Sequence, residues 1–189
     1  MMQSRKLLVL LFMAFAGGLD AFPETITLSL ELDEGNPPVT LRKTGETERR
    51  FLFFRVYRMA HYALPASGGS AGDILEASGP KLVRIIFDRK LDGAKLRDQF
   101  TETLRRGVPP ETWRKIRRSA AEYAAPFARG DTGKGDRFEV VWLENGRIRS
   151  FFNGRLMADI NNPDFPRALW SVWFGPQAVV DRDALLREW

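Results

Sequence analysis

Residues 50–62 decide the fold of this chain, and they read Arg50-Phe-Leu-Phe-Phe-Arg-Val-Tyr-Arg-Met-Ala-His-Tyr62. This density of β-branched and aromatic residues is typical of a β-strand. Alternate residues of a strand point to opposite faces, and both faces of this stretch are mostly apolar. Because a strand that is apolar on both faces is usually covered on both, we expect one long strand here, at the centre of a sheet.

The residues on either side predict strands and then two helices. Further strands are expected at residues 26–32, 39–42 and 82–88. Asp92 is an expected helix N-cap, and Gly107 is an expected end for the same helix. Pro109 and Pro110 start a second helix that runs to about residue 125, because proline is favoured in the first turn of a helix.

The C-terminal third predicts a meander followed by a helix. Asn145-Gly146 and Asn153-Gly154 are strong hairpin signals, because type I′ turns need a positive φ at both central residues. Asn162-Pro163 opens a helix that Gly175-Pro176 closes. A short helix is expected at residues 181–188. The hairpin signals separate three expected antiparallel strands at residues 137–144, 147–152 and 155–160.

Composition excludes several kinds of site. The 189 residues include no cysteine and one histidine, His61, so thiol chemistry, cysteine–metal sites and two-histidine metal sites cannot form within the chain. The net charge of the chain is +5, and this mild excess is not the concentrated positive charge that is typical of a nucleic-acid-binding protein. Residues 68–72 fit G-x-S-x-G, but they follow a loop rather than a strand, so we expect a flexible loop there. The basic run at residues 114–118 either contacts anionic lipid headgroups or, as we favour, is a solvated helix face.

The N-terminus has the pattern of a removable signal peptide. Arg5 and Lys6 precede an uncharged apolar run from Leu7 to Gly18. This run is short for a transmembrane helix and typical of a signal peptide, although an uncleaved anchor or a buried N-terminal helix is an alternative. We expect cleavage after Gly18 or Ala21. Residues 1–21 are therefore predicted to be a signal peptide and 22–189 a single domain, periplasmic or secreted.

One polar cluster within residues 50–62 has the chemistry of a ligand site. In the predicted strand, Arg55, Tyr57 and His61 share a face with Phe53 and Met59. A cation and a phenol beside an apolar wall can hold the head of an amphipathic anion. Each of these residues could instead be an ordinary core residue. For His61 we favour a core residue with satisfied hydrogen bonds over a ligand-binding one, and for Tyr57 we give the two interpretations equal weight.

Three blocks of the chain, in this order and spacing, resemble the bacterial chalcone isomerase-like family. They are residues 51–62, 81–88 and 153–175, and the resemblance extends over roughly residues 38–188. It implies an α+β open-faced β-sandwich, in which a large antiparallel sheet packs against a layer of helices with a ligand cleft between. The resemblance implies two possible activities: plant chalcone isomerases close a ring in a chalcone in this cleft, while related fatty-acid-binding members hold a carboxylate there with an arginine and a tyrosine.

The resemblance also implies which residues would form the site. Tyr57 falls where the enzymes have a catalytic threonine, as it does in the fatty-acid binders. The family's arginine ends a Leu-x-Gly-x-Gly-x-Arg motif, but Leu41–Thr47 has only one of the glycines and has Thr47 at the arginine position. We expect Arg49 or Arg50 to substitute. No counterpart of the enzymes' tyrosine and asparagine is identified near residues 96–103.

We therefore expect an exported, non-catalytic protein that binds a fatty acid or a similar small apolar anion. No cofactor, metal or nucleic-acid partner is expected, and peripheral membrane contact stays open. One alternative is an isomerase, an intramolecular lyase with chalcone isomerase-type ring closure. The other is a structural or interaction protein whose own side chains fill the cleft. The expected ligand-binding residues are Tyr57, Arg55, Arg49, Arg50 and His61.

Overall fold

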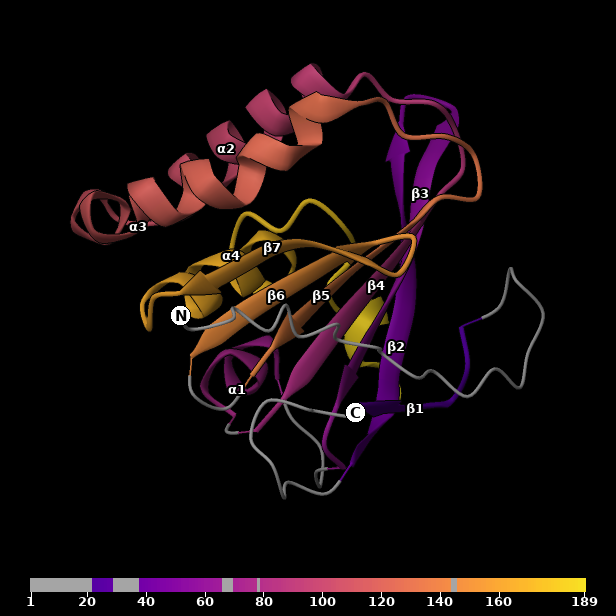
Figure 1. Cartoon of the computed structure of the whole chain (residues 1–189). Helices are drawn as coiled ribbons and strands as arrows, with labels where there is room; N and C mark the ends of the chain where they lie inside the picture. The colour runs from indigo at the N-terminus through magenta and orange to yellow at the C-terminus, as the bar shows by residue number, and fades with distance from the viewer. Residues whose placement is uncertain (1–21, 29–37, 66–69, 78, 144–145) are drawn as a thin grey trace, which may run out of the picture.

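The structure is a computed structural model that describes residues 22–28, 38–65, 70–77, 79–143 and 146–189. Within these residues, seven strands form one antiparallel sheet in which each strand pairs with its neighbours in the sequence (Figure 1). The predicted α+β fold, a large antiparallel sheet with a layer of helices, is confirmed. The strands are β1 (Thr25–Leu28), β2 (Val39–Phe51), β3 (Phe54–Ala63), β4 (Lys81–Phe87), β5 (Arg137–Trp142), β6 (Arg147–Phe152) and β7 (Arg155–Asn161).

Helices form the second layer. Two long helices, α2 and α3, lie side by side at the top of Figure 1, and α4 packs against both of them and against β6. No helix among the described residues is long and apolar enough to cross a membrane. The helices are α1 (Ala71–Glu76), α2 (Gly93–Gly107), α3 (Pro110–Ala124) and α4 (Phe165–Phe174), with 3₁₀ turns η1 (Ala125–Arg129) and η2 (Ala184–Leu186).

Local signals for the helix starts and hairpin turns are confirmed. The Asp92 carboxylate accepts a hydrogen bond from the Lys95 backbone N–H (2.8 Å), and α2 ends at Gly107. Asn153 and Gly154 both have positive φ, 49° and 78°, as a type I′ turn between β6 and β7 requires. Gly146 also has a positive φ, while Asn145 lies outside the described residues. The meander and α4 therefore form where the turn residues predict them.

The prediction of one long strand over residues 50–62 is wrong. β2 continues to Phe51, the chain turns at Leu52 and Phe53, and β3 begins at Phe54. Leu52 has a φ of 53°, a left-handed conformation that turns usually assign to glycine or asparagine. No glycine, asparagine or proline marks the turn, and so the apolar pattern conceals it.

Two smaller predictions also need correction. The flexible loop expected at residues 68–72 is wrong for its described part, because Ser70 caps helix α1, which begins at Ala71. The Ser70 hydroxyl accepts from the Asp73 backbone N–H (3.4 Å), and the Asp73 carboxylate accepts from the Ser70 backbone N–H (2.6 Å). A capping box thus occupies this serine, while residues 66–69 lie outside the described part. The C-terminal helix expected at residues 181–188 is only the 3₁₀ turn η2.

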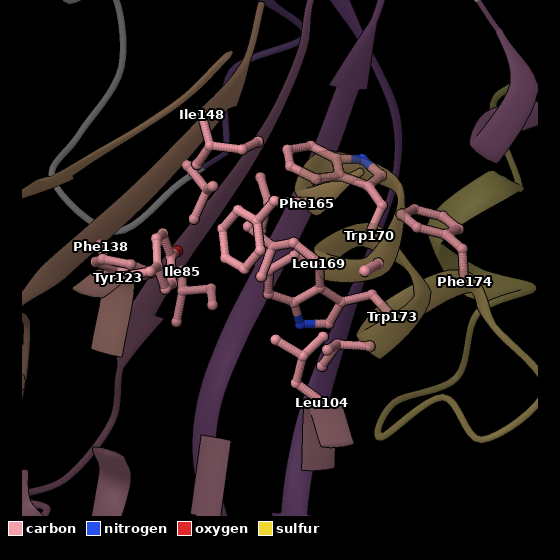
Figure 2. Packing of buried hydrophobic residues seen from close by; sticks show 14 of the residues in the cluster. Ile85, Leu104, Tyr123, Phe138, Ile148, Phe165, Leu169, Trp170, Trp173 and Phe174 are labelled. Atoms are coloured by element: carbon pink, nitrogen blue, oxygen red, sulfur yellow. The ribbon is translucent and has the colours of Figure 1, made fainter. Parts of the chain in front are cut away.

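Buried apolar side chains form a cluster on each face of the sheet. The larger cluster lies between the sheet and the helices, and Figure 2 shows the side chains of α4 that fill it, among them Trp170, Trp173 and Phe174. The smaller cluster, on the other face, includes Tyr62 and Leu82. Every residue of β4 is buried, and so are residues 59–63 of β3. The expectation of a central, doubly covered strand therefore holds for the inner half of β3.

Candidate functional site

The β2–β3 hairpin brings an arginine and a tyrosine together. Arg49 of β2 and Tyr57 of β3 are directly opposite each other in the antiparallel register. Directly opposed residues point to the same face, with their Cβ atoms about 5 Å apart. Tyr57 packs against the cluster between sheet and helices, so this pair lies at the margin of that apolar layer. Neither residue is fully buried.

The register also shows which arginine accompanies Tyr57. Thr47, at the family's arginine position, pairs with Met59, and Arg49 lies two residues further toward the hairpin tip on the same face. The Arg49 Nη1 donates to the Val179 carbonyl oxygen (2.6 Å), which fixes the side chain over the C-terminal segment. A guanidinium has five N–H donors, so this bond leaves others for a ligand.

Tyr57 is a neutral hydrogen-bond donor at ordinary pH. Its ring packs edge-on against Phe87, with a centroid separation of 6.2 Å. Burial raises the pKa of Tyr57 to about 12, although the Arg49 guanidinium and the Trp173 indole oppose the shift. The phenol therefore keeps its proton and presents an O–H beside a permanent cation. This combination suits an anion, which accepts from both groups.

Arg50 and Arg55 lie apart from this pair. A register shift between Arg49 and Arg50 places Arg50 opposite Arg55 near the hairpin tip, and both side chains are exposed. The Arg50 guanidinium pairs with Glu48. The Arg55 Nε donates to the Asp88 carboxylate (2.8 Å). The structure thus brings two of the five predicted site residues together and turns these two arginines to solvent.

His61 lies deeper on the same face, in a hydrogen-bonded network. Its Nε2 accepts from the Trp170 Nε1–H (3.2 Å), so the proton of the neutral ring is on Nδ1, which donates to the Thr44 hydroxyl (2.7 Å). That hydroxyl donates in turn to the Leu185 carbonyl oxygen (2.7 Å). Burial, and secondarily the Lys81 charge, lower the pKa of His61 to about 3. Both ring nitrogens are engaged within the protein.

Two buried hydroxyls in the same layer carry no sequence signal. Tyr123 of α3 and Ser150 of β6 are fully buried, and neither hydroxyl has a hydrogen-bond partner among the described residues. Burial raises the pKa of Tyr123, and Ser150 is close enough to oppose the shift, but the two do not reach hydrogen-bond geometry. Buried polar groups are normally satisfied, so these two would gain from a polar group between them.

One cavity of about 400 Å³ lies between α2 and the end of α3. Charged side chains and alanines line it, and none of the five predicted site residues does. The Arg49–Tyr57 pair is therefore separate from this hollow. Its lining residues are Arg97, Asp98, Thr101, Glu102, Ala121, Ala124 and Ala125.

Comparisons with known proteins agree with this architecture. The structure is similar to a fatty-acid binding protein of Arabidopsis thaliana, with a TM-score of 0.61 and 13% sequence identity. The match covers 77% of this chain and 84% of the plant protein. Among curated proteins, none is significantly similar in sequence. The model of the family described as chalcone isomerase-like matches residues 24–187. This chain belongs to the chalcone isomerase-like family.

Proposed function

We propose that this protein binds a fatty acid or a similar small apolar anion, whose carboxylate accepts from Arg49 and Tyr57. The observation that carries the proposal is the register of β2 and β3, which sets a cation and a neutral phenol opposite each other at the edge of an apolar layer. A structure of the same fold is named a fatty-acid binding protein, which supports the assignment. The tail would lie against Phe87, Leu104 and Trp173, all in that layer.

Entry of the tail would require α2 to move. Side chains already fill the space between sheet and helices, as the packing around Trp173 and Leu104 in Figure 2 illustrates. Of the fifteen residues of α2, only Gly93 and Leu104 are buried, while its Leu96 and Phe100 are partly buried. An element with few buried contacts opens at low free-energy cost. We therefore infer that α2 is the part of the cover that yields to a ligand.

The protonation states favour binding over proton-transfer catalysis. A general acid or base works best when its pKa lies near the operating pH. The pKa of Tyr57, about 12, and that of His61, about 3, both lie far from neutrality. His61 also uses both ring nitrogens inside the protein. The two residues would therefore hold and support a ligand rather than exchange protons with it.

The site predicts a specific pattern of affinities for laurate and palmitate. We expect Arg49→Gln and Tyr57→Phe each to weaken binding about tenfold, because each removes one hydrogen bond to a charged group. Arg50→Gln is the matched control, since it makes the same charge change at the next residue, which pairs with Glu48 instead. Isothermal titration calorimetry with each fatty acid measures the affinities.

Two results would remove the proposal. One is a purified protein that carries no lipid by native mass spectrometry and binds neither fatty acid. The other is an equal loss of affinity in Arg50→Gln and Arg49→Gln, which would indicate a general charge effect. Circular dichroism of each variant would establish that the fold is retained.

We also propose that the protein is exported and loses its N-terminal segment. The support is the basic pair Arg5-Lys6 followed by the uncharged apolar run Leu7–Gly18. Expression of the full chain in a Gram-negative host should give a periplasmic product that begins at Leu19 or Phe22. Intact mass and N-terminal sequencing measure this. Recovery of the uncut chain from the membrane fraction would instead indicate an anchor.

A further inference from the structure

The tip of the β2–β3 hairpin exposes four consecutive apolar side chains. Phe51, Leu52, Phe53 and Phe54 have exposed fractions of 64%, 74%, 89% and 58%. Phe51 and Phe54 are cross-strand partners, so the four side chains form one projection. Contiguous exposed apolar groups of this kind usually mark an interaction site. Only one other large apolar side chain in the described part of the chain is comparably exposed, Leu156 on β7 (52%).

The requirements of folding do not explain why this turn consists of apolar residues. Two-residue hairpin turns favour glycine, asparagine or aspartate, whereas here the central residues are Leu52 and Phe53. Leu52 adopts a positive φ, which is unfavourable for a side chain of its size. Apolar residues thus occupy solvent-exposed positions where polar ones would fold better. This pattern indicates a binding requirement at the tip.

A belt of arginines lies directly behind the tip. Arg50 and Arg55 are the next cross-strand pair, and the Arg89 guanidinium carbon lies 5.0 Å from the centre of the Phe54 ring. Among the described residues next to the tip, three arginines lie beside two carboxylates, so positive charge is in excess there. The arginines are Arg50, Arg55 and Arg89, and the carboxylates are Glu48 and Asp88.

We propose that the tip, residues 51–54, inserts into the surface of a membrane that contains anionic lipids. Apolar side chains at the end with arginines behind them match the order of acyl chains and phosphates in a lipid leaflet. Two residues of strand span roughly 7 Å, which agrees with the insertion depth of interfacial segments of roughly 5–10 Å. A stable protein–protein interface takes about 20–30 residues a side, far more than this tip offers.

Membrane docking by the tip does not depend on the proposed fatty-acid binding, but it would place the ligand site near the bilayer. Tyr57 follows Phe54 by three residues along β3, about 10 Å. Tip insertion would therefore hold the Arg49–Tyr57 pair close to the lipid headgroups. A protein that failed to bind fatty acids could still dock in this way, so the two proposals fail separately.

Vesicle binding tests the inference. The probes are large unilamellar vesicles of phosphatidylcholine alone, or of two parts phosphatidylcholine to one part phosphatidylglycerol. We expect the purified protein to sediment with the anionic vesicles and only weakly with the neutral ones. Leu52→Gly combined with Phe53→Ser should reduce the partition coefficient at least tenfold. This double variant should fold well, because glycine suits the positive φ of Leu52.

Matched controls separate the tip from the rest of the surface. Leu156→Ser removes an exposed leucine elsewhere and should leave binding unchanged. Arg50→Gln combined with Arg89→Gln should weaken anionic binding about tenfold. Arg114→Gln combined with Arg118→Gln makes the same charge change on exposed residues of α3 and should have little effect. All variants begin at the same N-terminal residue as the unmodified protein, so any contribution of residues 1–21 is common to them.

A label at the tip provides a second measurement. The chain has no cysteine, so Phe53→Cys gives a single site for an environment-sensitive fluorophore. Its emission should shift to the blue on addition of anionic vesicles, while the same label at Leu156→Cys should not respond. The inference is overturned if the label at residue 53 shows no shift, or if the Leu52→Gly, Phe53→Ser variant binds vesicles as the unmodified chain does. A dimer that forms through the tip, seen by sedimentation without vesicle binding, would also overturn it.

Discussion

Gly45→Ala is expected to lower the free energy of unfolding by about 3 kcal/mol or more, because no side chain fits at this position. A methyl group on Gly45 would lie 2.2 Å from the Ala184 carbonyl oxygen and 2.6 Å from the Leu185 carbonyl carbon. These contacts are with backbone atoms, which cannot rotate away. Two hydrogen bonds join β2 to the C-terminal segment at the same point. The Thr44 hydroxyl donates to the Leu185 carbonyl oxygen, and the Glu188 backbone N–H donates to the Thr44 carbonyl oxygen (2.8 Å).

Urea denaturation of the variant measures this effect. Gly130→Ala is the control, since a methyl group there meets no atom within 4 Å and its φ of −179° suits any residue. Removal of residues 184–189 should itself destabilise the protein, but Gly45→Ala should then cost much less, because the clashing backbone is absent. Equal unfolding midpoints for Gly45→Ala and Gly130→Ala would contradict the prediction.

His61 is expected to make stability depend on pH. At neutral pH the ring is uncharged in both the folded and the unfolded chain. Below the unfolded pKa of about 6.5 the unfolded chain gains a proton, whereas the folded protein does so only near pH 3. The contribution of His61 to the stability of the folded protein is therefore fully present above pH 6.5 and is lost as the pH falls toward 3. The loss attributable to His61 should be about 3 kcal/mol between pH 7 and pH 4.

His61→Gln isolates this contribution from that of the carboxylates. Glutamine does not titrate, so the variant should be less stable at pH 7 but should lose less stability on acidification. The contacts of His61 are Thr44, Trp170 and the Phe174 ring at 4.7 Å, and Lys81 adds the unfavourable charge. Urea midpoints at several pH values measure the difference. An NMR titration that placed the pKa of His61 near 6.5 in the folded protein would refute the prediction.

The features that the sequence predicts correctly are those that depend on neighbouring residues. The Asp92 cap, the proline start of α3 and the Asn153-Gly154 turn each depend on the conformational preferences of a few adjacent residues. The same holds for α4, which ends before Gly175. The resemblance of the chain to the chalcone isomerase-like family then indicated the overall arrangement, which the family match confirms.

The turn at Leu52-Phe53 has no signal in the local sequence. Its residues are typical of strands, and the alternation of the pattern continues through them, so no local signal separates β2 from β3. The turn forms because pairing of β2 with β3, from Arg42 opposite Ala63 to Phe51 opposite Phe54, outweighs the unfavourable Leu52 conformation. Tertiary pairing thus overrides the local preference.

The sequence alone determined the class of elements and the hairpins marked by asparagine and glycine, and it indicated Tyr57 as a candidate site residue. Only the tertiary structure decided that Arg49, and not Arg50 or Arg55, lies opposite Tyr57. It also decided that His61 bonds to Trp170, more than one hundred residues away. The physical reason is that strand register and cross-chain contacts depend on pairing between distant segments, and a one-residue shift exchanges the two faces of a strand.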